Sequence, residues 1–97
     1  MATYMLFLRE EAVHDPAEFA EYQRLNRENR DPSSPMEPLI VYGDIEALEG
    51  DAPDGIVLLR FPTAADARAW YDRPAYQEAL QHRLRAANYR AMIIEGL

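Results

Sequence analysis

The sequence predicts an α+β fold in which one antiparallel sheet is covered by helices on a single face. Four short apolar segments rich in β-forming residues alternate with helix-like segments, in the order strand, helix, strand, strand, helix, strand. A capping residue precedes each helical segment. The remaining stretches are rich in proline, glycine and aspartate, which is typical of loops.

The first strand and the first helix have the clearest signals. Thr3–Glu10 is β-rich and apolar in both alternating registers, which predicts a strand covered on both faces. In the following segment Asp15 is a good N-cap, Pro16 suits the first helical position, and Glu18 completes a capping box. This helix carries Tyr22 on its apolar side.

The middle of the chain contains two predicted strands. The segment Asp31–Pro38 holds three of the seven prolines, so it is expected to be a loop. A second strand is predicted over Leu39–Ile45 and a third over Ile56–Phe61. A turn region, Glu46–Gly55, separates them.

The last part of the chain predicts a helix in two segments and a closing strand. Thr63 caps the first segment, and Pro74 breaks the helix and starts the second. Asn88–Gly96 is the fourth predicted strand. The complete βαββαβ order predicts a ferredoxin-like sandwich with a four-stranded antiparallel sheet. With 97 residues, the chain is expected to form one domain over residues 1–97.

The strands are more apolar than such a sandwich requires. Helices cover only one face of its sheet, so the strands should alternate apolar with polar residues. Instead Leu6 and Leu8 oppose Met5 and Phe7, and the other strands behave in the same way. A second apolar face of several hundred Å² needs a cover. We therefore expect a homodimer in which two copies pair through the open sheet face.

Composition and charge exclude several classes of function. The net charge of −7 argues against a nucleic-acid surface, and no apolar stretch approaches the roughly 20 residues that cross a bilayer. The absence of cysteine excludes disulfides and thiolate metal sites. The first residues lack a basic leader, so the expected location is cytoplasmic. We expect no metal and no cofactor, because neither ligand motifs nor a glycine-rich phosphate loop are present.

A set of spaced residues in the last two-fifths of the chain is characteristic. The stretch RFPTAADARAWYDRPAYQEALQHRLRAANYRAMIIEG combines Phe-Pro-Thr, Ala-x-x-Trp-Tyr, Pro-x-Tyr-Gln, an arginine and a closing Glu-Gly. In this order and spacing it resembles the domain of unknown function 1330 family. The matching positions are Phe61, Pro62, Thr63, Ala67, Trp70, Tyr71, Pro74, Tyr76, Gln77, Arg83, Glu95 and Gly96.

The resemblance implies a ferredoxin-like fold that pairs as a dimeric α+β barrel, in agreement with the two-sided strands. It implies no settled reaction, because related barrels include small-molecule monooxygenases, isomerases, lactone-processing enzymes and members without known chemistry. The sequence departs from the family pattern at Arg60, where members often have an acidic residue. It also departs at Asp31–Pro38, which replaces a more usual glycine-containing segment.

Arg83 is the strongest candidate for a functional residue. It lies near the middle of the stripe that Tyr76, Ala79, Leu80 and Leu84 form on the predicted helix. A guanidinium cannot lose its charge in a protein, and burying it alone is costly. Three expectations for Arg83 remain open. It forms an ion pair with Glu10, Glu95 or another carboxylate, or its stem lies along the core with the head at the rim, or it holds the carboxylate of a small molecule.

Four aromatic residues are candidates for the wall of a ligand pocket: Tyr22, Trp70, Tyr71 and Tyr76. The competing interpretation is that they only complete the core. Arg60 is expected to pair with an acid across the dimer. His82 is expected to be solvated, and His14 to lie at a pocket mouth only as a minor possibility.

Two functions follow from these alternatives. The first is a small-molecule binding protein or cofactor-independent enzyme that acts on an apolar or aromatic carboxylate, in a pocket between helices and sheet. Isomerisation, lactone hydrolysis and cofactor-independent oxygenation are the reaction types open to it. The second is a non-catalytic homodimer, a structural or ligand-sensing module in which Arg83 forms an internal ion pair.

Overall fold

The computed structural model describes all 97 residues, Met1–Leu97. It contains four strands and three helices. In chain order these are β1 (Thr3–Arg9), α1 (Pro16–Glu28), β2 (Glu37–Val41), β3 (Gly55–Phe61), α2 (Ala64–Tyr71), α3 (Pro74–Ala86) and β4 (Tyr89–Glu95).

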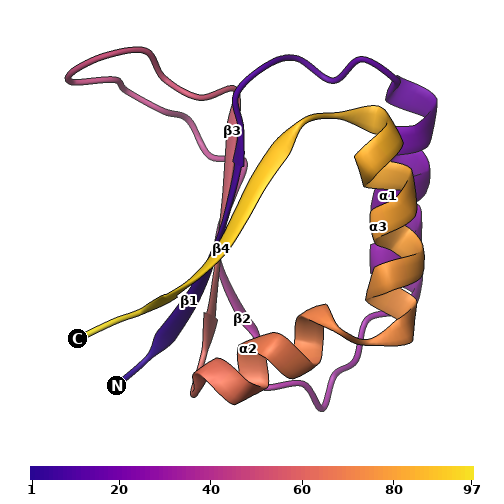
Figure 1. Ribbon diagram of the computed structural model, residues 1–97, viewed down its shortest axis with the longest axis vertical. Coiled ribbons are helices and arrows are strands. Elements are labelled where there is room, and N and C mark those ends of the chain that lie inside the picture. The colour runs from indigo at the N-terminus through magenta and orange to yellow at the C-terminus, as the bar shows by residue number, and fades with distance from the viewer.

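The strands form one antiparallel sheet in the order β2-β3-β1-β4. All three helices lie on the same side of it, with α1 and α3 next to each other and α2 at the lower end of the sheet (Figure 1). The prediction of a ferredoxin-like βαββαβ sandwich is confirmed. The break in the second helix is also confirmed, because Pro74 is the first residue of α3.

The helix starts follow from their capping residues. The Asp15 side chain accepts a hydrogen bond from the backbone N–H of Glu18, and the Thr63 side chain accepts one from Asp66. These bonds satisfy amide groups that have no partner within the helix. Both N-caps are the ones that the sequence predicted.

The second strand begins and ends earlier than predicted. It covers Glu37–Val41 rather than Leu39–Ile45. Pro38 is tolerated because β2 is an edge strand, where an N–H can be missing without loss of a ladder bond. The strand ends where Tyr42 adopts a left-handed backbone conformation with φ of 55°, which is uncommon for a residue other than glycine.

The core lies between the sheet and the helices. The sheet contributes Met5, Phe7, Leu59 and Phe61 to this core. The helices contribute Ala67, Tyr76, Ala79 and Leu80. The helices α1 and α3 stand away from the sheet, which leaves room for large side chains (Figure 1). Aromatic rings together with aliphatic side chains connect the two layers.

The buried stripe of α3 is centred on Arg83. Tyr76, Ala79, Leu80 and Ala86 flank it, and Arg83 itself is only 3% exposed. The helical wheel placed Leu84 with the core, and this prediction is wrong, because the Leu84 side chain is 59% exposed. α3 packs against α1, and the arginine, not the leucine, points inward.

The other face of the sheet has no cover within the chain. Residues that alternate with the core positions lie on it: Tyr4, Leu6, Leu8, Ile40, Ile56, Leu58, Met92 and Ile94. The accessible surface of 6351 Å² exceeds by about 650 Å² the value typical of a monomer of this mass. The long connection of residues 43–54 projects beyond this open face (Figure 1).

None of the three helices has both the length and the apolar character needed to cross a membrane.

Candidate functional site

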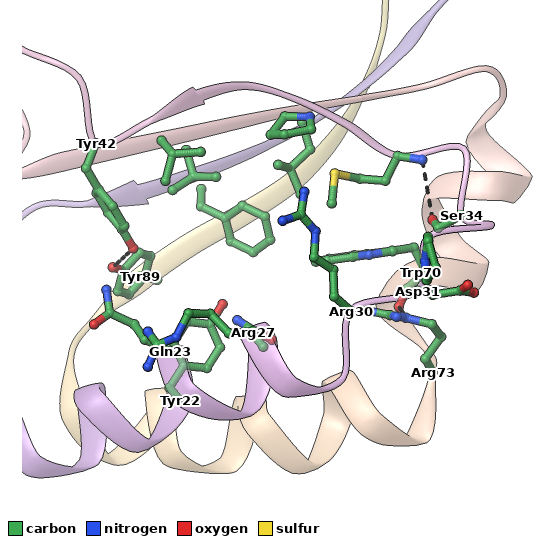
Figure 2. A pocket seen from close by; sticks show the side chains of 18 residues that line it. Tyr22, Gln23, Arg27, Arg30, Asp31, Ser34, Tyr42, Trp70, Arg73 and Tyr89 are labelled. Atoms are coloured by element: carbon green, nitrogen blue, oxygen red, sulfur yellow. Dashed lines mark hydrogen bonds between the residues drawn. The ribbon is translucent and has the colours of Figure 1, made fainter.

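A cleft of about 590 Å³ opens between α1, the helix-facing side of the sheet and the loop that follows α1. Its apolar walls are formed by Phe7, Val57 and Leu59 from the sheet, Tyr22 from α1 and Trp70 from α2. Tyr42 and Tyr89 lie together at one end, while Trp70 and three charged residues lie at the other (Figure 2). The size and the apolar lining suit a small organic molecule.

The proline-rich loop forms the charged end of the cleft. Asp31 accepts hydrogen bonds from the backbone N–H and the hydroxyl of Ser33, and these bonds lower the pKa of the Asp31 carboxyl. The loop is thereby held in a defined turn. Arg30 and Arg73 extend their side chains at this end, and Arg73 stacks over Trp70 with 5.0 Å between the guanidinium carbon and the ring centre (Figure 2).

Arg83 lies directly behind the cleft wall. Its guanidinium carbon is 5.5 Å from the ring centre of Phe7, 5.7 Å from Tyr22 and 4.7 Å from Tyr89. All three of these residues line the cleft. No carboxylate forms an ion pair with Arg83, and its Nε is buried without a hydrogen-bond partner.

Three aromatic rings contact the Arg83 guanidinium but supply no counter-ion. A desolvated cation–π contact stabilises by about 2 kcal/mol, so together the rings offset much of the several kcal/mol that a buried charge without a counter-ion costs. The expected internal ion pair is not formed, since Glu10 pairs with Arg90 and Glu95 belongs to no ion pair. The positive charge at Arg83 is therefore available to whatever occupies the cleft.

Arg83 is one of five arginines without a carboxylate partner. All ten basic residues of the chain are arginines, and five of them form ion pairs: Arg24, Arg60, Arg68, Arg85 and Arg90. None of the paired arginines lines the cleft. The unpaired ones are Arg27, Arg30 and Arg73, which line it, and Arg9 and Arg83, which pack against its aromatic wall.

Tyr22 and Tyr76 connect the two long helices next to Arg83. Their hydroxyl oxygens are 3.0 Å apart, and their rings meet edge to face. Burial and the neighbouring Tyr22 raise the pKa of the Tyr76 hydroxyl, while the Arg83 guanidinium opposes this rise. Tyr76 therefore stays protonated, and Tyr22 is the member of the pair that reaches the cleft.

The structure brings the five candidate residues together but in two layers. Tyr22 and Trp70 line the cleft, whereas Arg83, Tyr71 and Tyr76 lie behind it. Tyr76 is fully buried, with its ring centre 4.5 Å from that of Trp70 and 5.4 Å from that of Tyr71. Tyr76 thus supports the wall from behind.

The remaining expectations concern Arg60 and the two histidines. Arg60 lies 3.4 Å from Glu37 on the neighbouring strand of the same chain, and its pairing with an acid across the dimer stays a prediction. His82 is half-buried rather than solvated, because its Nδ1 lies 2.5 Å from a Glu18 carboxylate oxygen of α1. His14 is exposed and does not line the cleft.

Sequence reasoning missed Arg9, Tyr42 and Tyr89. Arg9 continues the alternation of Thr3, Met5 and Phe7 and therefore faces the helices, a signal that was readable from the strand pattern. Tyr89 is its direct partner on β4. The position of Tyr42 was not readable, because it depends on the left-handed turn that ends β2.

Three solved structures share this fold over nearly the whole chain. A protein of unknown function from Rhodopseudomonas palustris is 18% identical, with a TM-score of 0.69, over 99% of this chain and 82% of that one. A dimeric ferredoxin-like protein of unknown function from Thermobifida fusca is 14% identical, with a TM-score of 0.68, over 99% and 92%. SnoaB, a cofactor-independent oxygenase from Streptomyces nogalater, is 12% identical, with a TM-score of 0.57, over 99% and 92%.

At these identities the likeness concerns the fold alone. No curated protein matches the sequence. The family comparison is more specific, since residues 3–97 match the domain of unknown function DUF1330, and the match includes the Trp-Tyr, Pro-x-Tyr-Gln and Arg83 positions. The chain belongs to the DUF1330 family.

Proposed function

We propose that the cleft binds a small apolar or aromatic carboxylate. The observation that carries this proposal is the distribution of the arginines: each one that lacks a carboxylate partner lies in the cleft or against its wall. In a protein with a net charge of −7, such a concentration of positive charge favours an anion at this place.

The apolar lining supports the second half of the proposal. Phe7, Val57, Leu59 and Trp70 offer surface to the carbon skeleton of a ligand, while the cations offer charge. The Tyr22 hydroxyl is suited to donate to the ligand carboxylate, with Arg83 behind its ring. A direct bidentate contact with Arg83 would require the Tyr22 or Tyr89 ring to move aside.

The chemistry that these side chains support is stabilisation of negative charge and exchange of a phenolic proton. Both assist reactions through an enolate or a similar anion. Isomerisation and cofactor-independent oxygenation are of this kind, and SnoaB, which has a similar fold, is a cofactor-independent oxygenase.

A thermal-shift screen with small aliphatic and aromatic carboxylates tests the binding proposal. Hits should raise the unfolding midpoint of the wild type and lose at least tenfold in affinity with Arg83→Ala. Arg85→Ala is the matched control, because it removes the same charge from an exposed position two residues along α3. Equal losses in both variants, or a screen without hits, would contradict the proposal.

We further propose that the protein is a homodimer that pairs through the open sheet face. Its uncovered apolar residues, among them Ile40 at 41% and Ile94 at 42% exposure, support a partner there. Only 14 of the 97 residues are buried in the single chain, so association would add substantially to the core. The similar protein from Thermobifida fusca is dimeric.

Light scattering tests the dimer. The wild type should have twice the chain mass at micromolar concentration, and Leu6→Asp, at the centre of the open face, should give a monomer. Ala20→Asp on the exposed side of α1 is the control and should leave the dimer intact. A wild-type monomer would contradict the proposed pairing.

A further inference from the structure

The tyrosine end of the cleft contains a second cationic cluster, formed by Arg9, Tyr42, Tyr89 and Phe19. The guanidinium carbon of Arg9 lies 5.6 Å from the ring centre of Phe19, 5.5 Å from Tyr42 and 6.0 Å from Tyr89. Like Arg83, Arg9 has no carboxylate partner and a buried Nε without a hydrogen bond. Both guanidinium groups lie within 6.0 Å of the centre of the Tyr89 ring.

The hydrogen bonds of this cluster leave one proton unused. Arg9 Nη1 donates to the Tyr89 hydroxyl oxygen at 3.4 Å, because a guanidinium can only donate. The Tyr42 and Tyr89 oxygens are 2.6 Å apart, so one hydroxyl donates to the other (Figure 2). Two hydroxyls carry two protons, and this bond uses only one. The other proton has no acceptor in the protein, and both tyrosines line the cleft.

The backbone around the cluster is adapted to hold it. Arg9 lies between Gly55 and Tyr89 on the neighbouring strands. A Cβ atom at Gly55 would come within 2.9 Å of the Tyr42 ring and 3.5 Å of Arg9 Nη2, so glycine makes room for both. Tyr42 itself has the left-handed φ of 55°, a conformation that costs on the order of 1 kcal/mol or more. Such costs are typical of functional sites.

Tyr42 is held as a neutral donor. Burial, followed by the hydrogen bond with Tyr89, raises the pKa of the Tyr42 hydroxyl well above its ordinary value, and Arg9 opposes this only weakly. A neutral phenol next to a guanidinium offers a proton and positive charge but no negative charge. The preferred partner of such a group is an oxygen that accepts hydrogen bonds.

We propose that Tyr42 and Tyr89, backed by Arg9, form a second oxygen-binding subsite, and that the ligand is an oxo acid. This inference rests on the proposed carboxylate-binding function and narrows its substrate class. The carboxylate interacts with the Tyr22 and Arg83 side of the cleft. A carbonyl or enolate oxygen of the same molecule accepts the free phenolic proton of the tyrosine pair.

Matched pairs of acids that differ by one carbonyl oxygen test this subsite. Suitable pairs are 3-phenylpropanoate with 2-oxo-3-phenylpropanoate, and 4-phenylbutanoate with 4-oxo-4-phenylbutanoate. Isothermal titration should show at least one oxo acid binding about tenfold more tightly than its partner, the gain expected from one well-placed hydrogen bond. Each single variant, Tyr42→Phe or Tyr89→Phe, keeps one phenolic proton without an acceptor, so the double variant is the one that should abolish this ratio while the plain acid binds as before. If the double variant unfolds at a lower temperature, the two single variants should each reduce the ratio.

The outcomes separate this inference from the function on which it rests. Equal binding of both members of each pair overturns the oxo-acid subsite and leaves carboxylate binding intact. A ratio that persists unchanged in the double variant also overturns it. If neither member of any pair binds, the proposed function fails and the subsite fails with it. Arg83→Met should weaken both members of a pair equally, because it acts on the carboxylate that they share.

Discussion

The ten arginines of this protein fall into two groups of five with opposite surroundings. Those outside the cleft form ion pairs, for example Arg68 with Asp72 at 2.8 Å and Arg60 with Glu37 at 3.4 Å, on side chains that are at least half exposed. Those at the cleft form none. Among the unpaired arginines Arg27 and Arg30 are exposed, whereas Arg83 is buried, so the absence of a partner is most costly at Arg83.

This difference indicates that the burial of Arg83 is not explained by ion pairing within the chain. An exposed ion pair contributes at most about 1 kcal/mol, while a charge left alone in the interior costs several. A fold selected only for stability would place a leucine at position 83 and leave the arginine at the exposed position 84. The chain does the reverse, since Leu84 is exposed and Arg83 is buried.

The largest effect that tests this comparison is expected at Arg83. Arg83→Met removes the buried charge and keeps most of the volume, so the free energy of unfolding should stay the same or rise by about 1–2 kcal/mol. Arg83→Ala leaves a cavity and should lower it by about 2–5 kcal/mol. Urea denaturation of both variants measures the difference. If Arg83→Met is as unstable as Arg83→Ala, the charge stabilises the fold and the comparison fails.

An intermediate effect is expected at the half-buried pair of Glu18 and His82, which connects α1 with α3. The hydrogen bond with His82 lowers the pKa of Glu18 below its ordinary value of 4.5. A lowered carboxyl pKa means that the pair stabilises the protein above pH 4.5 and that this contribution is lost as the pH falls below it.

Glu18→Gln should therefore lower the unfolding midpoint at pH 7, and the gap to the wild type should close below pH 4.5. Melting curves followed by circular dichroism between pH 3 and pH 7 measure this gap. A gap that is constant over the whole range would show that the carboxylate charge is not involved. Carboxylate binding in the cleft should be unaffected, because Glu18 does not line it.

The smallest effect is expected at Arg68, an exposed member of the paired group. Arg68→Ala breaks its ion pair with Asp72 and should change the free energy of unfolding by less than about 0.5 kcal/mol. Ligand affinity should also be unchanged. A loss of affinity comparable with that of Arg83→Ala would mean that net charge, rather than position, determines binding.

The sequence was sufficient for the architecture and for half of the site. Capping residues, strand alternation and Pro74 act locally, so the elements and their order could be predicted. Arg83 could be found because a charge within an apolar stripe stands out. The cluster around Tyr42 could not be predicted from the sequence. It depends on the left-handed turn at Tyr42 and on Gly55, which lets the Tyr42 ring approach the backbone of β3. Cross-strand register is a tertiary property that one sequence does not reveal.

The proline-rich loop after α1 has a consequence for how this fold can diversify. It supplies Arg30, Asp31 and Met36 to the cleft, yet it belongs to neither the sheet nor a helix. Changes in its length or composition would reshape the entrance without disturbing the hydrogen-bond ladder beneath it. Ligands of different bulk are thereby accommodated on the same scaffold, while Arg9 on β1 and Arg83 on α3 keep their positions.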